Sequence, residues 1–206
     1  MTDFIYRREK ALSSSFCRSL IELFEIDKER QQEGVINRYG ETTIHKEEKA
    51  STDISFTPLD LKNKLWSKSL QQIIEVVEQS KQDWMCQYYK GLQRIDPFEI
   101  APPFNMQRFL PGEGYHKFHC ERASWTTCSR MGVWMIYLND VYDRGWTEFF
   151  YQQHFEIPKT GKIVCWPSDW THTHRGISSP TEKKYILTGW FTFIDIEKLK
   201  EKDVKS

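Results

Sequence analysis

Residue types that bind metals occur at a characteristic spacing in the second half of the chain. His119 and Glu121 are separated by one residue, and in an extended segment residues i and i+2 point to the same side. One metal ion could therefore bind both side chains. A second imidazole is available from His172 or His174, which follow a predicted strand at 163–166. Two histidines and one carboxylate on one face of a metal form a facial triad, the ligand set of non-haem Fe(II) oxygenases.

A lysine ten residues beyond His174 gives independent support, which matters because a His-x-Glu pair is common by chance. Lys184 opens a predicted strand. With a period of two, one face of that strand carries Lys184, Ile186, Thr188 and Trp190. A lysine that faces a β core is costly unless it meets an anion, such as a dicarboxylate co-substrate, to which Thr188 could also donate. In the opposite register, Lys184 lies in solvent, and Tyr185 and Leu187 face the core.

Aromatic residues and one arginine accompany these candidates. Tyr137 lies near the end of a predicted strand at 133–138. Its hydroxyl could bind the same carboxylate, although an ordinary core tyrosine fits the pattern as well. Arg130 and three tryptophans could line the mouth of a substrate site. These tryptophans are Trp125, Trp134 and Trp146, and core packing explains them equally well.

The predicted elements change character at about residue 100. Residues 10–25 predict an amphipathic helix that begins at a serine, and residues 26–56 predict a polar loop. A second helix is predicted from Thr57 to about Lys90. Short strands separated by turn residues are then predicted at 104–109, 133–138, 147–151, 163–166 and 185–194. Such a series of strands indicates a sandwich or a barrel.

The composition excludes several function classes. Lysine plus arginine equals aspartate plus glutamate, 29 each, so the net charge is zero and no nucleic-acid partner is expected. The longest apolar runs are far too short to span a membrane, which needs about 18 residues. The five cysteines are odd in number and include no CxxC pair. Together with a start that lacks an apolar leader, they favour a reduced, cytoplasmic protein.

The stretch from 107 to 190 resembles the prolyl 4-hydroxylase-like branch of the 2-oxoglutarate- and Fe(II)-dependent oxygenases, as found in small phage and bacterial proteins. The similar segments, in order, are 108–115 (RFLPGEGY), 119–121 (HCE), 137–141 (YLNDV), 145–149 (GWTEF), 161–167 (GKIVCWP) and 174–176 (HRG), followed by Lys184 and Trp190. Arg130 falls within the same series. The order and number of these segments make the resemblance far more specific than any single motif.

The resemblance implies a mainly β fold with flanking helices (α+β). The core would be a double-stranded β-helix, also called a jelly roll and similar to cupins, with N-terminal helices packed outside it. Residues 1–206 would form a single oxygenase domain. Within it, 1–100 would be a helical support region and 101–196 the catalytic core.

The resemblance also implies the roles of individual residues. The implied iron ligands are His119, Glu121 and His174. The spacing to Lys184 and the x-Gly that follows favour His174 over His172 as the distal ligand. The implied contacts to the distal carboxylate of 2-oxoglutarate are Lys184, Tyr137 and Thr188.

Two positions depart from the family pattern. Most members carry aspartate where Glu121 stands, but glutamate has the same charge and can complete the same triad. Many relatives carry tyrosine where Phe109 stands. Phenylalanine has no hydroxyl, so Phe109 cannot hydrogen-bond the co-substrate.

The implied activity is that of a dioxygenase that hydroxylates a C–H bond and releases succinate and CO₂. Its partners would be 2-oxoglutarate, O₂ and a peptide, protein or small-molecule substrate, with prolyl residues as the family-level expectation and ascorbate as a supporting reductant. Three alternatives are a cupin-like binding protein, a zinc hydrolase and a nucleic-acid demethylase. A hydrolase would have no use for Lys184 and Thr188. Neutral charge and a lysine anchor count against the demethylase.

Overall fold

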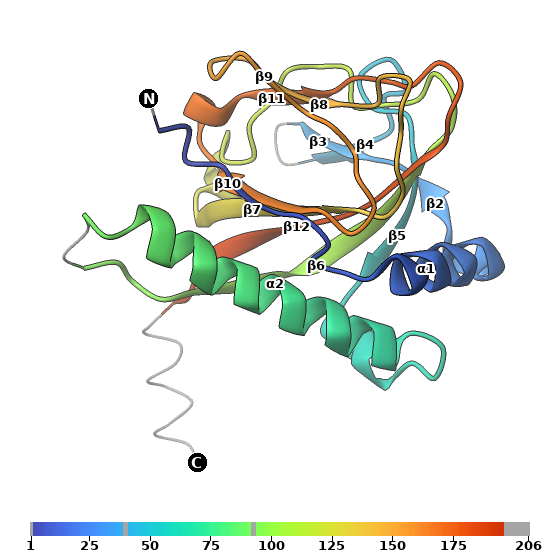
Figure 1. Cartoon of the computed structure of the whole chain (residues 1–206), viewed down its shortest axis with the longest axis horizontal. Coiled ribbons are helices and arrows are strands. Elements are labelled where there is room, and N and C mark those ends of the chain that lie inside the picture. The colour runs from blue at the N-terminus through green and yellow to red at the C-terminus, as the bar shows by residue number, and fades with distance from the viewer. Residues whose placement is uncertain (1, 39–40, 92–93, 196–206) are drawn as a thin grey trace.

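The structure contains two facing β-sheets, with helices packed against the outer face of the larger sheet (Figure 1). This computed structural model describes residues 2–38, 41–91 and 94–195. Within these ranges the α-helices are α1 (Ser14–Ile26) and α2 (Ser67–Tyr88). The strands are β1 (Tyr6–Arg8), β2 (Gln32–Glu33), β3 (Ile36–Arg38), β4 (Glu41–Thr43), β5 (Thr52–Phe56), β6 (Phe98–Phe109), β7 (Arg130–Tyr137), β8 (Thr147–Phe149), β9 (His154–Glu156), β10 (Ile163–Pro167), β11 (His174–Gly176) and β12 (Lys184–Phe193).

The order of the strands is that of a jelly roll. Seven strands form the larger sheet in the order β1-β10-β7-β12-β6-β5-β2, and all neighbours are antiparallel. Strands β11, β8 and β9 form the smaller sheet, and β3 and β4 form a separate hairpin. Most neighbours are distant in sequence, so the chain crosses repeatedly between the sheets. The expected jelly roll with external helices is confirmed.

The first helix agrees with the sequence pattern. The Ser13 side chain accepts a hydrogen bond from the Phe16 amide at 3.2 Å and caps the N-terminus of α1. Cys17, Leu20 and Phe24 are fully buried on one side of the helix, at helical spacing. Their burial attaches α1 to the outer face of the larger sheet.

The start of the second helix was predicted wrongly. Thr57 and Asp60 form a capping box, but it opens a short 3₁₀ turn over Pro58–Lys62. The Asn63 side chain then accepts from the amides of Leu65 (2.8 Å) and Trp66 (3.3 Å). Asn63 is extended and accepts from the second and third residues after it, as an N-cap does, so a new helix starts here and α2 is assigned from Ser67.

The predicted polar loop at 26–56 is also wrong in part. It contains β5, which pairs with β6 in the larger sheet and buries Ile54 and Phe56. Because β1 also joins that sheet, residues 1–100 are not only a helical support region. The last residue of the predicted core, 196, lies outside the described ranges.

The two faces of the larger sheet pack against different partners. The outer cluster includes residues from both helices, and its β12 members are Tyr185, Leu187 and Phe191. The inner cluster connects the larger sheet to β8, and its β12 members are Ile186 and Trp190. Lys184 belongs to the inner set by alternation and is buried. The predicted register of this strand is therefore confirmed.

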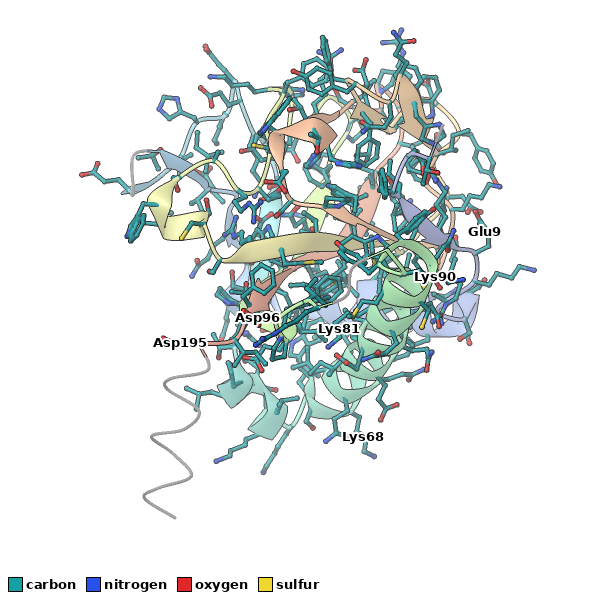
Figure 2. All side chains as sticks on the ribbon, turned by 90° about the vertical axis from the view of Figure 1, so that its left-hand side faces the viewer. Glu9, Lys68, Lys81, Lys90, Asp96 and Asp195 are labelled. Carbon is teal, nitrogen blue, oxygen red and sulfur yellow. The ribbon has the colours of Figure 1, made fainter. Side chains whose placement is uncertain are left out.

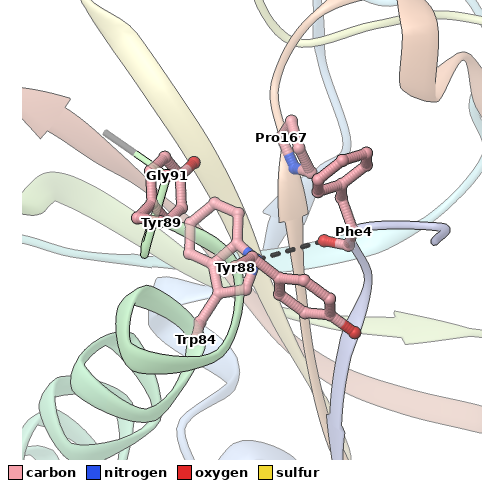
Figure 3. A pocket seen from close by; sticks show the side chains of 6 residues that line it. All are labelled: Phe4, Trp84, Tyr88, Tyr89, Gly91 and Pro167. Atoms are coloured by element: carbon pink, nitrogen blue, oxygen red, sulfur yellow. Dashed lines mark hydrogen bonds between the residues drawn. The ribbon is translucent and has the colours of Figure 1, made fainter. Parts of the chain in front are cut away.

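The N-terminal segment and α2 are joined by specific contacts. Trp84 Nε1 donates to the Phe4 carbonyl at 3.1 Å, beside a pocket of about 300 Å³ lined by aromatic side chains (Figure 3). Lys81 reaches from α2 to the sheet, where its Nζ donates to the Phe98 carbonyl at 3.1 Å (Figure 2).

Neither described helix has the length and apolar character that crossing a membrane requires.

Candidate metal centre and co-substrate site

A short backbone pairing places two histidines side by side. The His119 amide donates to the His174 carbonyl at 3.0 Å, and the His174 amide donates to the His119 carbonyl at 2.9 Å. His174 begins β11, whereas His119 lies on the loop between β6 and β7. The two imidazole centroids are 4.4 Å apart. The chain thus joins two distant segments at the inner side of the jelly roll.

Glu121 directs its carboxylate to the same place. Its amide donates to the Ser168 carbonyl at 3.1 Å, which attaches the loop to the residue after β10. Its Oε1 lies 3.5 Å from His119 Nε2 and 3.8 Å from His174 Nε2. In the part of the chain that the structure describes, these residues form the one set of three metal-ligating side chains whose donor atoms all lie within 4.8 Å of one another.

Both imidazoles are oriented through their second nitrogen. His119 Nδ1 lies 3.0 Å from the Lys117 carbonyl, and His174 Nδ1 lies 2.9 Å from the His172 carbonyl. A carbonyl oxygen can only accept, so each Nδ1 carries the proton. Each Nε2 is then left with a lone pair that a metal can bind, which is the usual arrangement around ligating histidines.

Burial and nearby charges hold these groups in the protonation states that metal ligands need. Burial alone would raise the pKa of Glu121. The neighbouring His119, His174 and Arg130 side chains outweigh burial and lower that pKa to about 2. Burial, followed by the proximity of His119, lowers the pKa of His174 to about 3. Near neutral pH the carboxylate is ionised and His174 is neutral.

His172, the competing candidate, is held elsewhere. Its Nε2 lies 2.9 Å from the Asp3 carbonyl, and its Nδ1 lies 3.1 Å from the Thr171 hydroxyl. Both nitrogens therefore have protein partners, away from Glu121. The structure brings His174, and not His172, together with the other two candidate ligands.

Lys184 is a buried cation that pairs with no carboxylate among the residues that the structure describes. It is 4% exposed, and its Nζ donates to one neutral acceptor, the Gly145 carbonyl, at 2.9 Å. The same Nζ lies 4.9 Å from the centroid of the Phe109 ring, so the residue that replaces tyrosine contributes a cation–π contact. Burial lowers the pKa of Lys184 from 10.5 to about 8, and no described carboxylate counters this shift. A dicarboxylate would supply the missing charge.

Comparison with known families fits these two features. A model of the 2OG-Fe(II) oxygenase superfamily matches residues 104–192, a stretch that contains the three candidate ligands and Lys184. Over this stretch, the chain is similar to the 2OG-Fe(II) oxygenase superfamily. Members of this superfamily use Fe(II) and 2-oxoglutarate. The residues present fit an Fe(II) ion and 2-oxoglutarate. Two histidine nitrogens and one carboxylate oxygen converge in a way that suits a metal, and the buried Lys184 ammonium could pair with a carboxylate.

Solved structures of several prolyl hydroxylases have the same fold. A Pseudomonas putida prolyl-4-hydroxylase aligns at TM-score 0.66 and 18% identity, over 94% of each chain. The viral collagen prolyl hydroxylase of Paramecium Bursaria Chlorella virus-1, in its 2OG complex, aligns at 0.63 and 15%, over 93% of this chain and 97% of that one. A Trichoplax adhaerens prolyl hydroxylase in complex with a hypoxia inducible factor peptide fragment aligns at 0.69 and 13%, over 100% and 88%. No curated protein matches the sequence.

The other two predicted co-substrate contacts already have protein partners. The Tyr137 hydroxyl is fully buried, 2.7 Å from the Thr147 hydroxyl and 3.4 Å from the Glu156 carbonyl. The Thr188 hydroxyl donates to the Trp134 carbonyl at 3.3 Å. Both hydroxyls would have to exchange a partner to donate to a carboxylate. Lys184 is therefore the strongest of the three predicted anchors.

Arg130 and Trp190 contact the candidate metal centre in a way that the sequence did not indicate. Trp190 Nε1 donates to Glu121 Oε2 at 2.8 Å, and an Arg130 guanidinium nitrogen lies 3.1 Å from the same oxygen. Arg130, which could line the mouth of a substrate site, contacts a candidate ligand. Of the tryptophans expected there, Trp134 is fully buried in the outer cluster, whereas Trp125 is 89% exposed.

Proposed function

We propose that the chain is an Fe(II)- and 2-oxoglutarate-dependent dioxygenase that hydroxylates a C–H bond of its substrate. His119, Glu121 and His174 would hold the iron, and Lys184 would bind the distal carboxylate of 2-oxoglutarate. The observation that carries this proposal is the buried, anion-free ammonium of Lys184 inside the same jelly roll as the triad. A metal site alone would not require it.

The bound iron would supply the oxidising chemistry, using O₂ and converting 2-oxoglutarate to succinate and CO₂. The chain would supply binding and shielding. Three protein ligands leave positions on the metal for the co-substrate and O₂. Lys184 would form a buried ion pair with the co-substrate and orient it, while apolar residues of the inner cluster, such as Phe149 and Ile186, keep water out.

The substrate proposed here is a prolyl residue of a peptide or protein. The support is the similarity in fold to three prolyl hydroxylases, one of them in complex with a peptide. Fold alone seldom determines a substrate, so this part of the proposal depends on direct measurement. The expectation of a cytoplasmic location likewise stays a prediction, in keeping with five free cysteines.

The test measures turnover of 2-oxoglutarate by protein from which a chelator has removed all metal and to which one metal is then added at a time. Fe(II) with ascorbate should restore succinate formation, whereas Zn(II), Co(II) and Ni(II) should compete for the same ligands without supporting it. His119→Ala, Glu121→Ala and His174→Ala should each abolish turnover. A peptide library, read by mass gains of one oxygen, would then identify the substrate. Activity with Zn(II) and inhibition by Fe(II) would instead indicate a hydrolase.

A further inference from the structure

The two oxygens of the Glu121 carboxylate have different surroundings. Oε1 faces His119 Nε2 and His174 Nε2. Oε2 faces away from the imidazoles and accepts from Trp190 Nε1 at 2.8 Å and from Arg130 at 3.1 Å. A carboxylate held in this way offers one oxygen to the space between the histidines and keeps the other bound to protein.

Arg130 and Trp190 form a unit of their own. The Arg130 guanidinium carbon lies 3.8 Å from the centroid of the Trp190 ring, so the guanidinium lies over the indole. The guanidinium also donates to the Glu121 carbonyl at 3.2 Å. Ser168 joins the backbones of Arg130 and Glu121, because its hydroxyl donates to the Arg130 carbonyl at 2.6 Å and its carbonyl accepts from the Glu121 amide.

We propose that Arg130 and Trp190 are positioning residues that restrict Glu121 to a single metal-binding oxygen. This inference rests on the proposed function, because it assumes that the triad holds a metal. Glutamate has one more methylene and one more rotatable bond than the aspartate expected at this place, so its carboxylate can turn to bind a metal through both oxygens. Engaging Oε2 prevents this turn. It keeps a coordination position open that a bidentate carboxylate would occupy.

The length of the side chain makes the inference testable. Glu121→Asp withdraws the carboxylate by roughly one C–C bond, about 1.5 Å. An aspartate that reaches the metal would then lie beyond hydrogen-bond distance of Trp190 Nε1. The Arg130–Trp190 pair should therefore matter in the glutamate protein and not in the aspartate variant.

The experiment is a double-mutant cycle on metal affinity, measured by calorimetric titration of metal-free protein with Mn(II) alone. Trp190→Phe and Arg130→Met should each weaken Mn(II) binding about 10- to 100-fold in the glutamate protein, as is usual when a partner of a metal ligand is lost. In the Glu121→Asp background, the same changes should alter affinity by less than about twofold. An equal loss in both backgrounds, or no loss in either, would overturn the positioning role.

Two further measurements keep the result interpretable. Arg122→Met and Trp170→Phe serve as controls, because Arg122 pairs with Asp169 at 2.8 Å and Trp170 is exposed, both outside the triad. Their Mn(II) affinity should match that of the unmodified protein. In Co(II)-loaded protein, Trp190→Phe should change the intensity of the visible d–d bands, which depends on coordination number, and an unchanged spectrum would contradict the proposal. If the unmodified protein binds Mn(II) no better than Glu121→Ala, the metal site and the proposed function fail together. Tight binding without any difference among variants refutes only the positioning role.

Discussion

Alternate residues of β12 face two different environments. On the outer side, Leu187 and Phe191 are fully buried against the two helices in an apolar cluster. On the inner side, Lys184 is also buried but has one neutral hydrogen-bond partner, and Trp190 donates to a candidate metal ligand. Neighbouring positions on β12 thus differ: one face contributes apolar packing to the core, and the other contributes polar groups to the candidate site.

The contrast is one of energy as well as chemistry. Burying a large apolar side chain stabilises the fold by roughly 1.5–3 kcal/mol, so the outer face accounts for much of the stability. A buried ammonium without an anion is unfavourable. A strand that needed only to fold would carry an apolar residue at position 184. If Lys184 binds the co-substrate as proposed, the inner face gives up stability so that a charge is available for that ligand, as functional sites commonly do.

The largest expected effect comes from removing that charge. Lys184→Ala would leave the distal carboxylate of 2-oxoglutarate buried without a counter-ion, which typically costs about 3–5 kcal/mol. The half-saturating 2-oxoglutarate concentration should rise by roughly 10² to 10³, at about 1.4 kcal/mol per tenfold. Fe(II) affinity, measured by calorimetry, should be nearly unchanged. Lys184→Arg should retain part of the activity, because a guanidinium meets a carboxylate in a different geometry. An unchanged 2-oxoglutarate requirement in Lys184→Ala would remove the main support for the co-substrate site.

The outer face should respond in the opposite way. Leu187→Ala removes a side chain with no exposed surface and should lower the free energy of unfolding by about 2–5 kcal/mol in urea titrations. The 2-oxoglutarate requirement of the folded variant should stay within about twofold of the unmodified protein. Ile186→Ala, one position away on the inner face, is the matched comparison and should alter both quantities. If the two variants behaved alike, the division between the faces would not hold.

The cost of the buried lysine should appear as a pH dependence of stability. Burial lowers the pKa of Lys184 in the folded protein to about 8, below the ordinary value of 10.5. Between these values the unfolded chain binds more protons, so the free energy of unfolding rises with pH from about 8 to 10.5. Each pKa unit is worth about 1.36 kcal/mol, which gives a gain of up to about 3 kcal/mol.

Lys184→Met isolates this contribution, because the variant shares every other titrating group. Without 2-oxoglutarate, the variant should be the more stable protein at pH 7, and the difference should shrink as the pH rises above 8. Saturating 2-oxoglutarate should favour the unmodified protein, since only its ammonium can pair with the ligand. Parallel stability curves for the two proteins would show that Lys184 is not a buried cation.

How far the sequence predicts this structure depends on how local each feature is. The period of two in β12 placed Lys184 on the inner face, because alternation is a property of the strand itself. The Asn63 cap, which separates α2 from the preceding 3₁₀ turn, and the five-residue β5 were missed, because a short polar-flanked segment carries little periodicity. The contact between Arg130 and Trp190 was missed for a different reason. It depends on the pairing of β7 with β12, whose register shifts between Phe191 and Thr192, and such an irregularity leaves no pattern in the sequence.

The smallest expected effect distinguishes the two histidines that the sequence left in competition. His172 is buried, and its Nε2 donates to the Asp3 carbonyl at 2.9 Å. His172→Ala removes that bond and should lower the free energy of unfolding by about 0.5–1.5 kcal/mol. Metal binding should survive, because His174 Nδ1 is oriented by the backbone carbonyl of residue 172, which alanine retains. His174→Ala should leave no measurable Fe(II) binding in the same calorimetric assay. The reverse result, with His172→Ala unable to bind iron and His174→Ala still active, would show that the distal ligand is His172 and that β11 does not form the metal site.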